Sequence, residues 1–216
     1  MHVLDICQYL AILYGVEIFM SNAEAATTTE GSSHRVYNEI KKICKEHGII
    51  HDVIGGAPEH KMKVAYNKED YIDFGTFLTV DQIKEKPTLI EWPCSSNLLY
   101  TLMLISPDYP TRENPKEKEW QYWLVTNIHG GDLKLSQTLT EYSPPTEIHG
   151  KEPHRMIFFA FQQRTTQEVN FTDPYLKKEA PSKERTYFEA REFADKYNFP
   201  ELIAMNFFLI KPTNST

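Results

Sequence analysis

The chain has 216 residues, of which 41% are hydrophobic and 25% are charged, and its formal net charge is −7. This length suits one domain with a sizeable hydrophobic core, and the composition excludes an intrinsically disordered chain. The negative charge argues against a nucleic-acid partner, because nucleic-acid phosphates require a basic surface. The segment Leu176 to Thr186 (LKKEAPSKERT) mixes both charges, so it indicates a solvated loop rather than a phosphate-binding track.

The first 25 residues differ in character from the rest of the chain. Residues 9–20 are apolar apart from Glu17, and Ala23-Glu24-Ala25 has the small-x-small form of a signal-peptidase site. The apolar run is too short to span a bilayer, so we expect no transmembrane segment. We predict that residues 1–25 are a cleaved signal peptide of a secreted protein. The segment contains no lysine or arginine, which argues against secretion, so a disordered or amphipathic N-terminal arm on a cytoplasmic protein is the alternative.

The next segments combine a linker, a helix and a first strand. Residues 26–35 are polar and form a linker, after which residues 36–212 make up a single domain. Apolar residues recur at helical spacing from His34 to His47 and predict an amphipathic helix, which Gly48 ends. The alternation in Lys61 to Tyr66 predicts a half-buried strand, and Thr79 to Lys86 is predicted to form one helical turn.

Five apolar runs then dominate the chain. Each is flanked by turn-forming residues and enriched in aromatic side chains, which favours strands covered on both faces over buried helices. The runs are Thr88 to Trp92, Leu98 to Ser106, Trp120 to Ile128, Met156 to Gln163 and Leu202 to Ile210. Tyr187 to Tyr197, before the last run, is predicted to be an amphipathic helix. The fold class is therefore mostly β, with a few helices.

The cysteines leave the redox state open. Cys7 falls in the predicted signal peptide, which leaves Cys44 and Cys94. Cys44 lies on the apolar face of the predicted helix, where a buried free thiol is the commoner outcome. A Cys44–Cys94 disulfide remains the alternative for a secreted protein.

The usual catalytic and metal-binding patterns are missing from the sequence. It has no nucleophile elbow, phosphate-binding loop, dinucleotide fingerprint or zinc-protease motif, and no histidine pairs with cysteine at zinc spacing. His129-Gly-Gly-Asp132 indicates a hairpin turn rather than a metal site. We therefore expect no enzymatic activity, no metal and no cofactor.

Polar residues gather at the ends of three predicted strands. The loop after Ser106 contains Asp108, the third strand begins with Trp120 and Tyr122, and His154-Arg155 precedes the fourth. If these ends meet at one rim, they form apolar walls with a few convergent polar groups, as in small-ligand pockets. Arginine and protonated histidine would favour an anion such as phosphate.

Structural roles for the same residues remain open. Asp108 and Arg112 are four residues apart and could pair within their own loop. His154 could bond only to its neighbours at a strand start. Trp120 and Tyr122 could be ordinary aromatic residues of the core or of the sheet surface.

Taken together, these segments resemble the phosphatidylethanolamine-binding protein family. Its first signature, close to D-P-D-x-P-x-R with a following tryptophan-rich strand, is similar to SPDYPTRENPKEKEWQYWLVTN from Ser106 to Asn127. Its second corresponds to His154-Arg155 before MIFFAFQQ. The segments Phe77 to Trp92 and Tyr187 to Phe208 are also similar to the family. The resemblance covers residues 36 to 210, and the helix and leader are similar to the secreted insect branch, which includes antennal or odorant-binding-like proteins.

The resemblance implies a central antiparallel β-sheet packed on a smaller sheet, with peripheral α-helices. It also implies a non-enzymatic binding or regulatory module whose small pocket takes a phosphate-like anion or a phospholipid headgroup. The alternative is a protein-interaction module that inhibits or scaffolds a kinase or protease and whose pocket is vestigial. Asp108, Pro110, Trp120 and His154 match family pocket positions. Tyr122 and Arg155 complete the predicted ligand-binding set.

Five departures from the family pattern affect the expected pocket. Ser106 stands where an aspartate is usual, Tyr122 where a histidine is typical, and Met156 where a tyrosine follows H-R. The loop from Tyr142 onwards lacks the family's G-x-G-like stretch, and no C-terminal helix is recognisable after Ile210. We expect a pocket whose mouth and ligand differ from those of the family.

Overall fold

The structure is a computed structural model that describes residues 36–213. Residues 40–213 belong to one compact unit, and residues 36–39 belong to a separate N-terminal unit. Residues 36–46 are helical, as expected, whereas the predicted signal peptide and linker lie outside the described residues. Within residues 36–213, no helix has both the length and the apolar character needed to cross a membrane.

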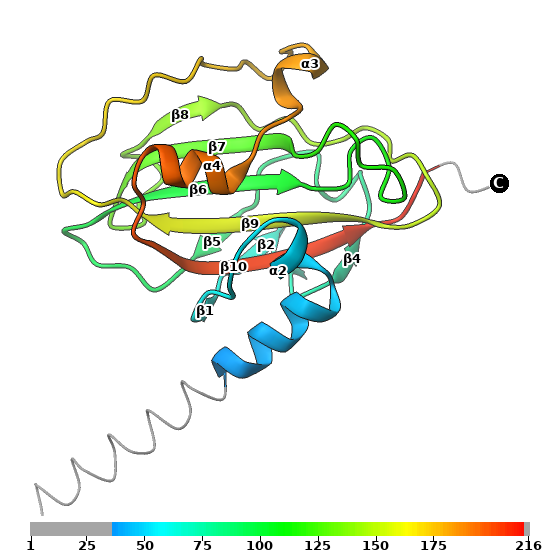
Figure 1. Cartoon of the computed structure of the whole chain (residues 1–216), viewed down its shortest axis with the longest axis horizontal. Helices are drawn as coiled ribbons and strands as arrows, with labels where there is room; N and C mark the ends of the chain where they lie inside the picture. The colour runs from blue at the N-terminus through cyan, green and yellow to red at the C-terminus, as the bar shows by residue number, and fades with distance from the viewer. Residues whose placement is uncertain (1–35, 214–216) are drawn as a thin grey trace, which may run out of the picture. The chain divides into compact units, whose positions relative to one another are not determined.

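The larger unit is built on two sheets (Figure 1). The seven-stranded sheet has the order β1 (His60–Lys61), β10 (Glu201–Ile210), β9 (His154–Gln162), β6 (Leu99–Ser106), β7 (Trp120–His129) and β8 (Gln137–Thr140), with β4 (Thr76–Leu78) also paired to β10. The five strands from β10 to β8 are antiparallel, and β1 and β4 run parallel to β10. The smaller sheet is antiparallel, in the order β3 (Asp70–Tyr71), β2 (Lys63–Tyr66) and β5 (Leu89–Glu91). The predicted mostly β class is confirmed.

The central sheet is buried on both faces because different layers cover it. Successive strand residues point to opposite faces, so Leu104 of β6 packs towards the small sheet while its neighbour Ile105 packs towards the helices. The helical layer includes α2 (Ile49–Asp52) and α4 (Ala190–Lys196), which lie on the face nearer the viewer in Figure 1. The two-sided burial explains the continuous apolar runs in the sequence.

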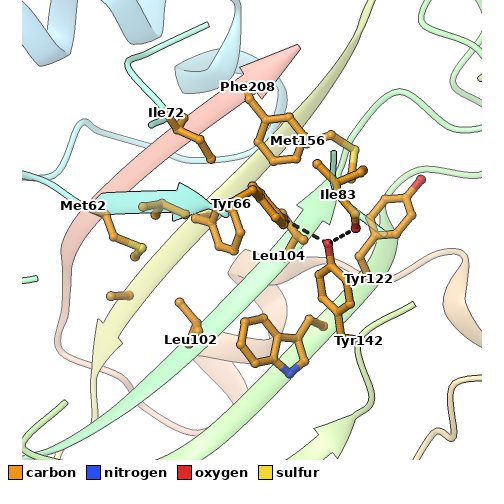
Figure 2. Close-up of a cluster of buried hydrophobic side chains, with 14 of the residues drawn as sticks. Met62, Tyr66, Ile72, Ile83, Leu102, Leu104, Tyr122, Tyr142, Met156 and Phe208 are labelled. Atoms are coloured by element: carbon orange, nitrogen blue, oxygen red, sulfur yellow. Dashed lines mark hydrogen bonds between the residues drawn. The ribbon is translucent and has the colours of Figure 1, made fainter. Parts of the chain in front are cut away.

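Buried tyrosines form hydrogen bonds within the core between the two sheets (Figure 2). The Tyr142 hydroxyl donates to the Ile83 carbonyl oxygen at 2.7 Å and bonds with the Tyr66 hydroxyl at 3.1 Å. Because buried hydroxyls need such partners, these bonds fix the loop of Ile83 against the sheet. They also anchor Tyr142, and the next residue, Ser143, donates its N–H to the Tyr122 carbonyl at 3.0 Å.

The four longest predicted strands are confirmed to within two residues of their ends. Thr79 to Lys86 was wrongly expected to form a helical turn, because that segment contains turns but no helix. The strand from Lys61 to Tyr66 is interrupted at Met62, whose N–H donates to Met205 and whose carbonyl accepts from Asn206. The helix predicted from Tyr187 begins only at Ala190.

The short elements β3, β4, β8, α2 and α3 (Ser182–Arg185) had no counterpart in the sequence prediction. They have two to four residues each, too few for a periodic pattern to be visible. Cys44 is buried and free and Cys94 is exposed and free, so the structure contains no disulfide between them.

Candidate functional site

A cavity of about 330 Å³ lies where the ends of β6, β7 and β9 meet. Four of the six predicted ligand-binding residues line it: Pro110, Trp120, Tyr122 and His154. Tyr109, the loop 143–149, and Ala180, Ser182 and Arg185 complete the wall. The expected meeting of strand ends thus occurs, but with a partly different set of side chains.

A β-bulge in β7 directs Tyr122 towards this cavity. Leu104 pairs with Trp123 and the next residue, Ile105, pairs with Gln121, so Tyr122 is the extra residue. A bulge re-aims the side chain it carries, and Tyr122 accordingly packs on the same side of the sheet as its neighbour Trp123. The Tyr122 hydroxyl points away from the hydroxyls of Tyr66 and Tyr142 (Figure 2). Burial raises the pKa of Tyr122, so the phenol stays protonated and remains a donor.

Aromatic rings form one wall of the cavity. The Trp120 ring lies 4.3 Å from the Tyr109 ring and 5.8 Å from the Tyr122 ring, measured between centroids. The Trp120 Nε1–H is buried and has no acceptor among the described residues. A buried donor without a partner costs free energy, and no described residue offsets that cost at this wall.

His154 contributes an imidazole that is neutral near pH 7. Its Nε2 donates to the His149 carbonyl oxygen at 3.0 Å, which leaves Nδ1 as an acceptor in the neutral ring. Burial lowers the pKa of His154, and the nearby Asp108 carboxylate opposes that effect. The bond to His149 matches the structural role that the sequence left open, and the ring lines the cavity as well.

Asp108 and Arg155 lie elsewhere than the predicted rim. Asp108 is 0% exposed and does not line the cavity. Its carboxylate accepts from Arg155 three times: from the backbone N–H at 2.7 Å, Nε at 3.0 Å and Nη2 at 2.6 Å. Arg155 Nη1 also donates to Asp52 at 2.7 Å. The two charges therefore neutralise each other beside the cavity.

The strand geometry explains why Arg155 is directed away from the cavity. Neighbouring residues of β9 face opposite sides of the sheet, and His154 already faces the cavity. Arg155 instead lines a different hollow, of about 450 Å³, together with Asp52 and Lys118. The expectation that His154 and Arg155 face one opening does not fit this geometry.

The loop after β6 also differs from the sequence interpretation. Arg112 does not pair with Asp108; its Nε lies 3.5 Å from the Glu152 carboxylate, and its Nη1 donates to the Pro153 carbonyl. Ser106 is fully buried, and its hydroxyl accepts the Asp108 N–H at 3.2 Å. Met156 is a core residue and does not line the cavity. Of the three substituted positions only Tyr122 lines the cavity, and the altered loop 143–149 lines it as well.

Arg185 is the charged, buried residue among the lining residues that the sequence interpretation missed. It lies in the segment predicted to be a solvated loop, yet it is 1% exposed. No periodic pattern marks a single buried arginine within a run of mixed charges, so the sequence carries no signal for it.

Other candidate chemistry is limited. Among residues 36–213, no group of three or more histidine, cysteine, aspartate or glutamate side chains is arranged to hold a metal ion. The segment of His129 forms a turn, in which the Asp132 N–H donates to the His129 carbonyl at 2.9 Å. The predicted turn is confirmed.

Comparison with known proteins identifies the family. The model of the phosphatidylethanolamine-binding protein family matches residues 75–208, which is more than half of the chain. "Putative odorant-binding protein A5" of Drosophila melanogaster is 28% identical over 78% of this chain and 79% of its own length. The "26 kDa secreted antigen" of Toxocara canis is 28% identical over 74% of this chain, and the match spans only 60% of the antigen.

A solved structure supports the fold independently. The carboxypeptidase Y inhibitor, solved in complex with its cognate proteinase, superposes with a TM-score of 0.68. It is 21% identical, and the match covers 82% of this chain and 97% of the inhibitor. Together with the family match, these comparisons show that the chain belongs to the phosphatidylethanolamine-binding protein family.

Proposed function

We propose that the chain is a non-enzymatic binding module whose 330 Å³ cavity takes a phosphate-like anion, either free or as part of a phospholipid headgroup. Members of this family are generally non-enzymatic binding and inhibitor proteins. Cavities of this kind, with apolar walls and a few convergent polar groups, are typical small-ligand sites.

One observation carries the proposal: residues from three separate segments line a single cavity, namely Pro110, Trp120 with Tyr122, and His154. Trp120 offers an unpartnered N–H, and Tyr122 offers a hydroxyl that stays protonated. The Asp108 carboxylate, in the loop after β6, does not line the cavity, so it does not repel an anion there. Asp108 and Arg155 act as support, because their ion pair holds the start of β9 against the loop.

Thermal unfolding with added ligand tests this proposal. Inorganic phosphate, phosphorylethanolamine and vesicles containing phosphatidylethanolamine are the probes, which separate a free anion from a lipid. A ligand at 100 times its Kd stabilises the folded state by about 2.7 kcal/mol, so the melting temperature should rise with ligand concentration. The proposal fails if no probe at millimolar concentration changes the melting temperature.

A pair of matched variants localises the binding. Tyr122→Phe removes a donor from the cavity and should weaken anion binding by about tenfold or more, the usual value of one hydrogen bond to a charged group. Tyr100→Phe is the control, because Tyr100 is equally buried in the core but does not line the cavity. Equal loss of affinity in both variants would place the ligand elsewhere.

Secretion is part of the same proposal. The apolar run and the small-x-small site in residues 1–25 support it, as does a relative described as a secreted antigen. N-terminal sequencing of protein from its natural source should begin after Ala25; a mature protein that begins at Met1 would overturn it.

A second candidate function is inhibition or scaffolding of a protease or kinase. Its support is the inhibitor fold, which binds a proteinase in the complex named above. A pull-down from the native fluid, repeated with His154→Ala, separates the two candidates. A partner that persists with the variant supports cavity-independent interaction, and a partner lost with the variant favours the cavity.

A further inference from the structure

Arg185 is a buried cation whose hydrogen bonds all go to neutral groups. Its side chain donates to backbone carbonyls only: Nη1 to Gln121 at 3.0 Å, and Nη2 to Lys177 at 2.6 Å, Glu141 at 3.2 Å and Lys178 at 3.4 Å. Its Nε–H has no acceptor within the described part of the chain. Burying a charge without a counter-ion is costly, so this arrangement calls for an explanation.

The carbonyl contacts show how Arg185 is held in place. Gln121 belongs to β7, and Glu141 and Lys177 belong to loops far away in sequence, so the guanidinium joins three segments. The Glu141 carboxylate is occupied by the Tyr175 hydroxyl and the Lys178 N–H, and it attracts Arg185 only at longer range. A role as a clamp explains the Nη bonds, but it leaves the Nε–H unexplained.

Arg185 lines the proposed anion cavity, and its charge dominates there. Burial lowers the pKa of His154, so that ring is neutral above pH 7. Two further lining residues, Glu147 and His149, have side chains that are about half exposed and lie 3.6 Å apart, so they act on the solvent side and on each other. The interior thus offers one permanent positive charge together with the uncharged donors of Trp120 and Tyr122.

We infer that Arg185 is the fixed cation of this cavity and that it makes the cavity selective for an oxyanion with one negative charge, such as a phosphodiester. An oxyanion in the cavity supplies the acceptor that the Nε–H lacks and the counter-charge that the guanidinium lacks. A phosphomonoester carries close to two charges above pH 7, and the second finds no buried cation. The inference rests on the proposed function of the cavity.

Nuclear magnetic resonance of the full chain at pH 8 tests the inference directly. The probes are glycerophosphorylethanolamine, a phosphodiester, and phosphorylethanolamine, a monoester, followed by vesicles with and without phosphatidylethanolamine to separate lipid from free headgroup. The Arg185 Nε–H and the Trp120 Nε1–H should shift with the same Kd. The diester should bind about tenfold more tightly than the monoester. If Arg185 only joins the three segments and does not contact the ligand, its Nε–H resonance should not shift.

Variants provide the second readout. Arg185→Lys keeps the charge but loses the Nε–H, and it should weaken diester binding by about tenfold or more, as expected for a charge-assisted hydrogen bond. Arg191→Lys, on the exposed face of α4, is the control and should bind like the wild type. Because Arg185 also joins three segments, binding is compared only after both variants show a cooperative unfolding transition; if Arg185→Lys does not fold, the wild-type resonances decide.

The outcomes distinguish the two proposals. A Trp120 shift without an Arg185 shift, or tighter binding of the monoester, overturns the inference and leaves the binding function intact. Coincident shifts with diester preference support it. No resonance change and no thermal stabilisation with any probe overturns the proposed function, and the inference falls with it.

Discussion

Glu119 tests how the burial of a carboxyl group makes the stability of this fold depend on pH. The residue precedes β7 and is 4% exposed, and its carboxylate accepts the Ala190 N–H at 2.9 Å, at the start of α4. Burial raises the pKa of Glu119 from 4.5 to about 8, with a smaller contribution from Glu189. The folded state therefore holds a proton that the unfolded state releases near pH 4.5.

The sign of the effect follows from proton linkage. Stability from the neutral carboxyl is fully present below pH 4.5 and is lost as the pH rises through about 8. Each pKa unit between 4.5 and about 8 corresponds to about 1.4 kcal/mol, so ionisation of Glu119 lowers the free energy of unfolding by at most about 5 kcal/mol at pH 9. Glu119→Gln keeps an oxygen acceptor for Ala190 and removes the charge. We expect the free energy of unfolding of the variant to match that of the wild type at pH 5 and to exceed it by about 3 to 5 kcal/mol at pH 9.

Urea unfolding at pH 5, 7 and 9 measures these differences. Glu201→Gln, at an exposed position of β10, removes the same charge and controls for net charge. A Glu119→Gln effect that is the same at all three pH values would show that the buried carboxyl does not titrate as the structure requires. A variant less stable than the wild type at pH 9 would refute the reasoning outright.

Two further predictions concern buried groups. Asp108→Asn should lower the free energy of unfolding by about 3 to 5 kcal/mol in urea titrations, because it leaves Arg155 buried with a weakened partner; a loss below about 1 kcal/mol would mean that the pair contributes little. Burial raises the pKa of Cys44 to about 12, so pulse alkylation at pH 8 with peptide mapping should label Cys94 and spare Cys44. Equal labelling of the two thiols in the folded protein would contradict the packing of Cys44.

Much of the fold was readable because its signals are local. The runs that became β6, β7, β9 and β10 are long, apolar and bounded by turn residues, so strand type followed from composition and length. The signatures around Pro110, Trp120 and His154 indicated the family for the same reason, because each is made of residues that are neighbours in the sequence. The cavity was predicted from these residues, and all three line it.

One wrong placement was avoidable from local pattern, whereas the other features depended on contacts between distant segments. Strand alternation alone separates His154 from Arg155, so that error was avoidable from the sequence. The bulge that turns Tyr122 into the cavity arises from the pairing of β7 with β6, which no local pattern displays.

The sequence by itself determined the four long strands, their burial and the family. Only the tertiary structure decided which buried charges are paired with a counter-ion and which are bonded to neutral groups. Asp108 pairs with Arg155, 47 residues away, whereas Arg185 reaches carbonyl groups up to 64 residues away. The reason is physical: periodicity is a property of neighbouring residues, but the partner of a buried charge is chosen by the packing of the whole chain.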